Sequence, residues 1–393
     1  MKITFVLPMY LNSPSGGFKV VYEYANRLAA LGHQVAVVHP RTIAPQSGLV
    51  EAVKKRLWKF KLRNIPNRKP LHRRGAENTE DAQRLWQKTL RNLCDALRLG
   101  GENASLRLVP WFKVNDNVNL ILATDLNEQN IPDADAIFAT ASDTAFPVAA
   151  CSVNKGRKFY LVQSYEAWNL PEETVIASWQ LPMHKIVVSR QLQQIAASLG
   201  EAQRTTYIPL GLDVSVFRLL TPIHERHELR VGMLAHPNEV KGSRDGLAAL
   251  ELVKAKLPDL QVALFGTEPR LDFIPEWMSY ERLPSAERLV ELYNSCRIFL
   301  NPARAEGWGL PAAEAMACGC AVVSADNGGI HEFAVDGETA LIVPIQRPDL
   351  LAEKILALID DDELRWRLAV AGHQSIQQFS WEQAVNSMIE VLS

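Results

Sequence analysis

The stretch KITFVLPMYLNSPSGGFKVVYEYANRLAALGHQVAVVHP, residues 2–40, decides the fold class. Its opening run, KITFVLP, has the length and apolar character of a buried strand, and SPSGG supplies a turn. The segment FKVVYEYANRLAALG has helical spacing and ends at Gly32, and HQVAVVHP is a second apolar strand. The order strand, helix, strand predicts a parallel pair with a glycine-rich first turn that contains Gly16 and Gly17.

The same alternation continues along the chain. Apolar runs predict further strands at residues 134–140, 158–164 and 185–190, and each is followed by a loop or a helical stretch. Strands that are apolar throughout belong to mostly parallel sheets covered on both faces. The first half of the chain is therefore predicted to be a doubly wound α/β domain.

A change of composition at residues 207–228 marks a second domain. This stretch, YIPLGLDVSVFRLLTPIHERHE, is rich in proline, glycine and charge and resembles a linker, and alternation of strands and helices restarts after it. We predict two Rossmann-like doubly wound domains facing a cleft, at residues 1–208 and 209–379. Residues 380–393 have Ser380 as a candidate N-cap and apolar residues at helical spacing, which predicts a helix that returns to the N-terminal domain.

Composition narrows the class of protein. A chain of 393 residues with 47% hydrophobic content can fill two cores, and its formal charge of -2 argues against nucleic acid as the main partner. The five cysteines have no CxxC spacing, which favours a reducing compartment. The first apolar run is too short for a secretory leader, and none reaches the ~20 residues of a membrane helix. We expect a cytoplasmic protein.

A basic segment interrupts the N-terminal half. Residues 51–74, within an insertion at about 48–110, carry many bases, a single acid and interleaved Trp58 and Phe60. Such a segment is typical of a surface that lies on an anionic membrane or holds an anionic acceptor. A solvated insertion is the alternative, because Pro66 and Pro70 interrupt any helix.

The segment EGWGLPAAEAMACGC, residues 306–320, is the strongest candidate site. It follows the strand RIFLNP, and Pro311 suits the first turn of the next helix, so the segment is a strand-to-helix junction at the carboxyl end of a parallel sheet, where ligands bind. Carboxylates such as Glu306 and Glu314 accept paired hydrogen bonds from the vicinal diol of a hexose or ribose. The alternative for Glu314 is a carboxylate that only stabilises the helix N-terminus.

The order of segments, from SPSGGF at residue 13 through VKGS and the block at 301–344 to FSWEQA at 379, resembles the family 4 retaining glycosyltransferases of the GT-B fold. The resemblance covers nearly the whole chain. It implies that a nucleotide-diphosphate sugar, UDP- or GDP-linked, binds the C-terminal domain as co-substrate, with no other cofactor and no metal. The acceptor, a glycan or lipid-linked glycan, would lie against the N-terminal domain.

The resemblance also assigns residues. Lys241 matches the lysine that faces the diphosphate, Glu306 the glutamate beside the transferred sugar, and Glu314 the one that holds the ribose; the first two are the candidate catalytic residues. The remaining donor-binding candidates are Gly16, Gly17, Arg282, Leu283, Gly307, Trp308, Gly309 and Leu310. Glu166, in FYLVQSYEAW, and Asp143 are candidates on the acceptor side. FYLVQSYEAW resembles a variant in subgroups that build bacterial surface polysaccharides.

Two positions depart from the family pattern. Met233 stands where an arginine that contacts the diphosphate is expected, and Arg244 or Arg304 is the candidate replacement. The stretch DAIFATASDTAF lacks the histidine that many relatives carry near the acceptor, so the roles of Ser142 and Asp143 are open.

Rival functions remain at this point. A sugar-nucleotide epimerase on the same fold would need acid/base groups and no acceptor, and a non-catalytic donor-binding partner is compatible with Met233. The acidic run 359–364 is interpreted as a solvated turn. The histidines His33, His39, His184 and His331 lack metal-ligand spacing, so we expect no metal site.

Overall fold

The computed structural model describes residues 1–41, 109–168, 170–226 and 229–393. They form two compact units: the first holds residues 1–41, 109–161, 170–185 and 195–205, and the second holds 162–168, 186–194, 206–226 and 229–393. The predicted basic segment at 51–74, with nearly all of the insertion around it, lies outside the described residues. The predicted return of the last helix to the N-terminal domain stays a prediction.

The first sheet has seven strands among the described residues, in the order β3-β2-β1-β4-β5-β6-β7. Its pairs β1–β2, β2–β3, β1–β4 and β4–β5 are parallel, as predicted, and Phe5 of β1 lies in register with Val37 of β2 and Phe138 of β4. The strands are β1 (Lys2–Val6), β2 (Gln34–Pro40), β3 (Val118–Ala123), β4 (Ala136–Ala139), β5 (Arg157–Val162), β6 (His184–Val187) and β7 (Thr205–Tyr207). The helices that accompany it are α1 (Gly16–Ala30), α5 (Ser142–Ala150), α6 (Glu172–Trp179) and α7 (Arg190–Ser198).

The first helix begins earlier than predicted. Ser15 has extended backbone angles, and Gly16 and Gly17 are the first two residues of α1 and not part of a turn. The helix ends as expected, because Gly32 takes the left-handed conformation with φ +87° that a glycine adopts at no steric cost. The two glycines thus form the N-terminal end of α1, directly after the loop that leaves β1.

The second sheet has six strands among the described residues, in the order β10-β9-β8-β11-β12-β13. All of its pairs are parallel. The strands are β8 (Arg230–Leu234), β9 (Gln261–Gly266), β10 (Ser279–Arg282), β11 (Ile298–Asn301), β12 (Ala321–Ala325) and β13 (Leu341–Val343). The helices are α8 (Ser243–Lys256), α9 (Ala286–Ser295), α10 (Leu310–Ala317), α11 (Pro348–Asp360), α12 (Asp362–Ile376) and α13 (Trp381–Leu392).

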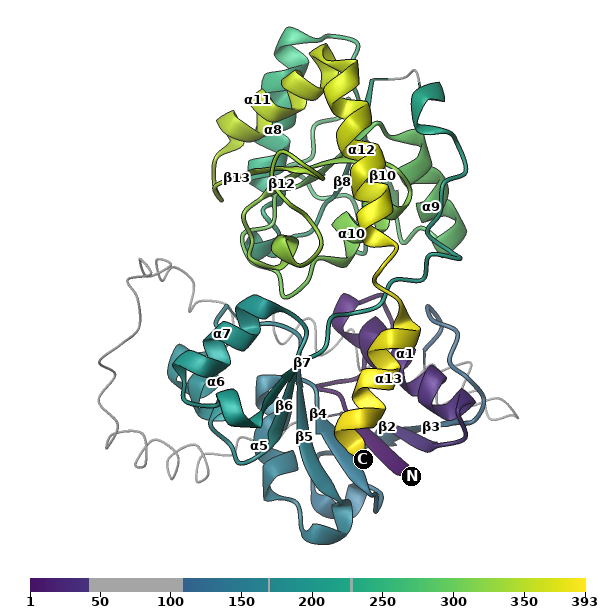
Figure 1. Ribbon diagram of the computed structural model, residues 1–393, viewed down its shortest axis with the longest axis vertical. Helices are drawn as coiled ribbons and strands as arrows, with labels where there is room; N and C mark the ends of the chain where they lie inside the picture. Colours follow the sequence, from purple (N-terminus) through teal and green to yellow (C-terminus); the bar gives the residue numbers. More distant parts are fainter. Residues whose placement is uncertain (42–108, 169, 227–228) are drawn as a thin grey trace. The chain divides into compact units, whose positions relative to one another are not determined.

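The core of the second sheet is made by its central strands and the helices on it. Helices α8 and α11 pack against each other, and α10 packs against β11 and α12 (Figure 1). Met233 of β8 is fully buried in this core and lies in register with Leu264 of β9 and Leu300 of β11. The acidic run at 359–364 is the exposed junction of α11 and α12, where the Asp361 carboxylate accepts a hydrogen bond from the Leu364 N–H at 2.8 Å.

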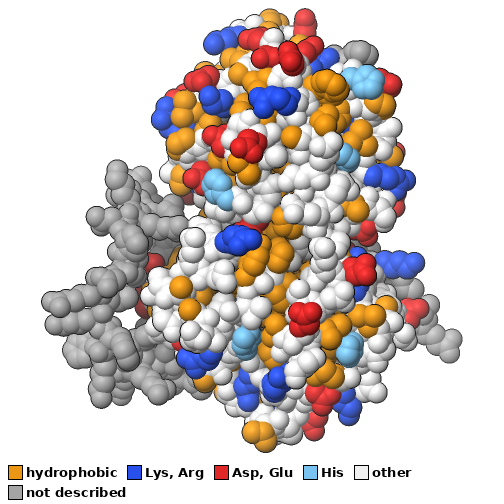
Figure 2. Space-filling model, in the orientation of Figure 1, with side chains coloured by type: hydrophobic (Ala, Val, Ile, Leu, Met, Phe, Trp, Pro, Cys, Tyr) orange, Lys and Arg blue, Asp and Glu red, His pale blue; other side chains and the backbone are white. Residues whose placement is uncertain are grey.

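The surface carries mixed charge. On the face drawn in Figure 2, the described acidic and basic side chains are interspersed and do not gather into a basic stripe. Cys151, Cys296, Cys318 and Cys320 are buried thiols. None of the helices in the described parts of the chain is long and apolar enough to cross a membrane.

Candidate functional site

The candidate site is built at the point where the strand order of the second sheet reverses. Strand β8 lies next to β9 on one side and β11 on the other, so the connections that leave β8 and β11 diverge to either side of the sheet. In parallel sheets this divergence opens a crevice at the carboxyl ends of the strands, where ligands bind. The loop after β8 (235–242) and the loop after β11 (302–309) border this crevice.

The loop after β8 is fixed by its own hydrogen bonds. The His236 N–H donates to Ser243 Oγ at 2.8 Å, the Asn238 N–H donates to His236 Nδ1 at 3.0 Å, and the Val240 N–H donates to Asn238 Oδ1 at 2.9 Å. The short 3₁₀ turn Glu239–Lys241 then leads through Gly242 into α8. Lys241 is therefore held by a constrained loop one residue from a helix N-terminus, which favours anions.

Lys241 and Glu306 are brought together. The Lys241 ammonium donates to Glu306 Oε1 at 2.8 Å, and the two side chains are 32% and 14% exposed. A second bond joins the loops directly, because the Arg304 N–H donates to the Val240 carbonyl at 2.7 Å. In the described residues, Glu306 Oε2 has no hydrogen-bond donor. The pair is thus partly screened from water and still open to a ligand.

Gly242 decides whether this loop can form. It has φ +64°, and a Cβ there would lie 2.0 Å from the Pro302 carbonyl oxygen. We expect Gly242→Ala to lower the free energy of unfolding by more than ~2 kcal/mol, since the strain of a left-handed alanine and the overlap with backbone add. Gly337→Ala is the matched control, because Gly337 has φ +75° and nothing within 4 Å. Urea unfolding checks both; equal losses would contradict the overlap argument.

Glu314 occupies the first turns of α10, as predicted. It is 5% exposed, and the buried Tyr293 hydroxyl donates to its Oε2 at 3.2 Å. Burial raises the pKa of Tyr293, and the charge of Glu314 raises it further, so the phenol stays a donor. A side chain of α9 therefore fixes the Glu314 carboxylate. This contact is compatible with a carboxylate that holds the ribose and with one that only stabilises the N-terminus of α10.

The segment between the two glutamates has buried side chains. Gly309, with φ +105°, is the N-cap of α10, and the Trp308 ring packs against Phe333 at 4.9 Å between ring centroids. The Trp308 Nε1–H is buried without a hydrogen-bond partner among the described residues. Gly307, Trp308, Gly309 and Leu310 can therefore serve a ligand through their backbone, while the indole mainly packs the loop.

The donor-binding candidates Arg282 and Leu283 lie at the end of β10 and directly after it. Leu283 is a non-glycine residue with φ +51°, it is 41% exposed, and its N–H donates to the Gly266 carbonyl at 2.8 Å. Strained backbone of this kind is typical of ligand-binding loops. The Arg282 Nε–H donates to the Thr267 carbonyl at 3.3 Å, which ties the turn to the loop after β9.

Both arginines proposed to replace the charge missing at Met233 have partners. The Arg304 guanidinium makes two hydrogen bonds to the Asp245 carboxylate, at 2.9 and 3.2 Å. The Arg244 guanidinium lies over the Phe273 ring, 4.0 Å from its centroid. A diphosphate would have to compete with Asp245 for Arg304 or draw Arg244 off the ring.

The first unit has a reversal point of its own, between β1 and β4. Gly16 and Gly17 follow β1, and Ser142 and Asp143 open α5 directly after β4, so the sequence-predicted residues of this unit flank one crevice. The buried Ser142 hydroxyl is 3.0 Å from the Tyr160 hydroxyl. Glu166 is half-buried in the 162–168 segment of the second unit.

Asp143 is held at a cost to stability. Burial raises the pKa of Asp143 to about 6, against two opposing backbone hydrogen bonds, and its Oδ1 is buried without a hydrogen-bond donor among the described residues. The pKa of Asp143 is higher in the folded protein than in the unfolded chain. The protonated carboxyl therefore makes its full contribution to the free energy of unfolding below the unfolded pKa, and this contribution is lost as the pH rises toward 6. Carboxyl groups kept under such strain mark functional sites.

Asp143→Asn should therefore stabilise the protein in a pH-dependent way. We expect the free energy of unfolding of the variant to exceed that of the wild type by roughly 2 kcal/mol more at pH 7 than at pH 4, from the pKa difference. Chemical unfolding at both pH values measures the difference, with the exposed Asp116→Asn as control. A gap that does not change with pH would contradict a strained carboxylate.

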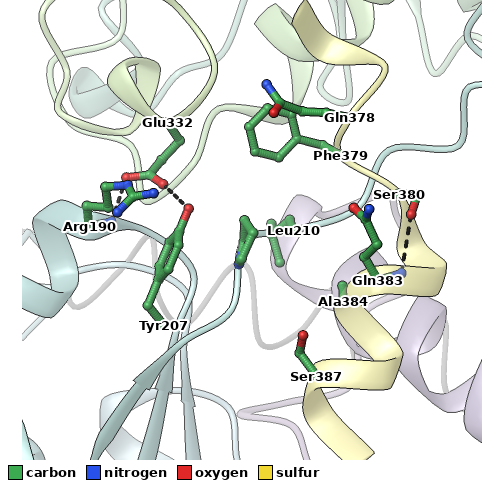
Figure 3. Close-up of a pocket in the computed structure, with 11 residues that line it drawn as sticks. Arg190, Tyr207, Leu210, Glu332, Gln378, Phe379, Ser380, Gln383, Ala384 and Ser387 are labelled. Atoms are coloured by element: carbon green, nitrogen blue, oxygen red, sulfur yellow. Dashed lines mark hydrogen bonds between the residues drawn. The ribbon is translucent and has the colours of Figure 1, made fainter.

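A hollow of about 370 Å³ lies elsewhere in the second unit and contains none of the predicted donor residues. Figure 3 shows Glu332 facing Tyr207 and Arg190, with Gln383 and Ser387 of α13 on the other side. The Tyr207 hydroxyl donates to Glu332 Oε2 at 2.6 Å, and the Arg190 N–H donates to Oε1 at 2.5 Å. Sequence reasoning missed this cluster, because its members come from four separate segments of the chain.

Sequence reasoning also missed His236. A search for histidine pairs with metal-ligand spacing passes over a single histidine, although its place two residues after the strand LRVGML was a usable signal. In the described part of the chain, no group of three His, Cys, Asp or Glu side chains could hold a metal ion.

Part of the second unit is similar to a known protein family. Residues 226–361, which include Lys241, Glu306 and Glu314, match the family model of Glycosyl transferases group 1. An uncharacterized glycosyltransferase of Methanocaldococcus jannaschii, MJ1178, is 36% identical over 107 residues, 27% of this chain and 30% of that protein. The phosphatidyl-myo-inositol mannosyltransferase of Mycobacterium tuberculosis H37Rv is 26% identical over 250 residues, 56% and 62% of the two chains. The chain spans less than two thirds of the length of these curated relatives.

Solved structures match the whole chain. Anabaena HepE in complex with UDP-glucose has a TM-score of 0.70 at 15% identity, covering 100% of this chain and 99% of that one. Sucrose-phosphate synthase of Thermosynechococcus elongatus has a TM-score of 0.67 at 17% identity, covering 99% and 98%. At this identity the likeness shows the fold alone, and it confirms the prediction of two parallel-sheet α/β domains of the GT-B type.

Proposed function

We propose that this protein is a family 4 retaining glycosyltransferase that moves a hexose from a UDP- or GDP-linked sugar to a glycan or lipid-linked glycan acceptor. The observation that carries the proposal is the Lys241–Glu306 pair, at 2.8 Å, at the order reversal of the second sheet. The group 1 glycosyltransferase match over residues 226–361 and the UDP-glucose bound by Anabaena HepE support it.

Lys241 would act on the leaving group. When the bond from the anomeric carbon to the phosphate oxygen breaks, the electron pair goes to the nucleoside diphosphate, which gains negative charge. Lys241 and the N-terminal end of α8 stabilise that charge, and preorganised groups of this kind are worth a few kcal/mol each. The acceptor oxygen then bonds to the anomeric carbon on the same face, and its proton passes to the departing phosphate.

Glu306 would act on the sugar. Its Oε1 orients Lys241, and its second oxygen can accept hydrogen bonds from sugar hydroxyls as the ring takes on positive charge. Glu314, fixed by Tyr293, would accept from the ribose diol. Leu283 and Arg282 would border the base through the strained turn after β10.

The acceptor side is proposed for the first unit. The carboxyl of Asp143 at the start of α5 is the acceptor-side candidate of this unit, and Glu166, in the 162–168 segment of the second unit, is the further candidate. Gly16 and Gly17, at the start of α1, are proposed to approach the diphosphate and the transferred sugar of the donor. We propose a role in bacterial surface polysaccharide synthesis, in the cytoplasm or at the inner face of the plasma membrane, with residues 51–74 meeting an anionic lipid surface.

Incubation of the full chain with a panel of UDP- and GDP-linked hexoses tests the proposal. Thermal shift identifies the donor, since a ligand at 100 times its dissociation constant adds about 2.7 kcal/mol of stability. Slow release of free sugar and nucleoside diphosphate would support a transferase, and the anomeric configuration of the released sugar would report retention. An epimerised sugar nucleotide would indicate an epimerase, and binding without any turnover would indicate a non-catalytic donor-binding partner.

A further inference from the structure

His236 lies in the loop that carries Lys241, and its ring is half-buried beside the charged pair. Lys241, Glu268 and Glu306 all lie close enough to act on its charge. The loop is anchored at both ends, because the His236 N–H is bound by Ser243 and the neighbouring Ala235 N–H donates to the Phe265 carbonyl of β9 at 2.8 Å. The ring is therefore fixed at the carboxyl end of β8, at the border of the crevice.

The hydrogen bond from Asn238 determines which ring nitrogen carries the proton. A backbone N–H can only donate, and the Asn238 N–H donates to Nδ1 at 3.0 Å, so Nδ1 is the unprotonated nitrogen. Burial lowers the pKa of His236, and Lys241 lowers it further against Glu268 and Glu306, so the ring is neutral near pH 7. The proton of a neutral ring with Nδ1 as acceptor is on Nε2. Among the described residues, no acceptor for this Nε2–H is found.

The chemistry around the ring favours an anionic oxygen as its acceptor. The loop leads into the N-terminus of α8 beside an ammonium group, an arrangement that attracts phosphate. Met233, three residues earlier, is fully buried and has no donor, and the guanidinium groups of Arg244 and Arg304 are engaged by Phe273 and Asp245. A neutral N–H adds a hydrogen bond there without adding repulsion to Lys241.

We propose that His236 is a further donor-binding residue, which donates its Nε2–H to a diphosphate oxygen of the nucleotide sugar. This role rests on the proposed function and adds to it a side chain that binds the diphosphate. The Nδ1 atom of the same ring accepts from Asn238 and so helps to hold the loop that carries Lys241. One side chain thus both positions Lys241 and contacts the leaving group.

Two variants separate the two nitrogens. His236→Asn keeps an oxygen near the position of Nδ1, able to accept from Asn238, but has no group at the position of Nε2. His236→Gln can place an amide N–H near the position of Nε2 but leaves the Asn238 N–H without its acceptor. Titration calorimetry with UDP, GDP and the matching nucleosides, together with thermal unfolding of the free proteins, gives the readout.

Wild type is expected to bind either UDP or GDP. We expect His236→Asn to bind that nucleoside diphosphate at least about tenfold more weakly than wild type does. Its nucleoside binding and its melting temperature should be unchanged. His236→Gln should keep most of the diphosphate affinity and melt earlier. Wild-type diphosphate affinity in His236→Asn, or an equal loss for diphosphate and nucleoside, would overturn the inference and leave the proposed function standing. Absence of binding of UDP, GDP and their sugar conjugates to wild type would overturn both.

Discussion

Replacing Lys241 with methionine is expected to lower the turnover number of sugar transfer or donor hydrolysis by about 10²–10³-fold, with a smaller loss of donor affinity. Methionine keeps the length of the side chain and removes the charge that stabilises the departing diphosphate. Steady-state kinetics with the donor found in the panel measures both quantities.

The controls for this prediction come from the same helix region. Lys256→Met removes an exposed lysine at the far end of α8 and should leave turnover unchanged. Because Lys241→Met also leaves Glu306 without its 2.8 Å partner, the double variant Lys241→Met with Glu306→Gln shows how much of the loss comes from the unpaired carboxylate. A single variant with wild-type turnover would remove Lys241 from the mechanism.

Glu306 and Glu314 are expected to fail in different ways. Glu306→Gln should lower turnover by roughly 100-fold, because Glu306 is assigned to the transferred sugar, which changes shape toward the transition state. Binding of the bare nucleoside diphosphate, which lacks that sugar, should change little. Glu314→Gln should weaken the donor and the free nucleotide alike, by the ~1.5–3 kcal/mol of a charge-assisted hydrogen bond. Calorimetry with the nucleoside diphosphate and kinetics with the donor decide between them.

Tyr293→Phe is the control for Glu314. It removes the donor to Glu314 Oε2 and keeps the carboxylate, so it reports the structural share of that contact. If Tyr293→Phe and Glu314→Gln lose stability equally and neither changes nucleotide binding, Glu314 is only a helix-start carboxylate. If Glu306→Gln loses nucleotide binding and Glu314→Gln keeps it, the two assignments are reversed.

The type and order of most elements could be predicted from the sequence. Apolar runs and helical spacing are local properties, and they identified β1, β2, β4 and β5 and the start of α10 close to their observed bounds. Local patterns were weaker for β3 and the short β7, where burial is incomplete along the strand, and these were not predicted.

The individual site residues were also visible as candidates. Glu306 and Glu314 follow a predicted strand, so their place at a strand end followed from local structure, whereas Lys241 was a candidate through the family resemblance. Their contacts did not, because Lys241 and Glu306 are 65 positions apart in sequence and meet only when β8 and β11 become neighbours.

By itself, the sequence determined that the chain folds as two doubly wound α/β domains and that Glu306 and Glu314 lie at a strand-to-helix junction. Only the tertiary structure decided that Lys241 pairs with Glu306, that Arg304 is held by Asp245, and that His236 has its proton on Nε2. The physical reason is range: periodicity and turn residues act over one or two turns of chain, whereas ion pairs and tautomers depend on strand order, burial and the donors that other segments supply.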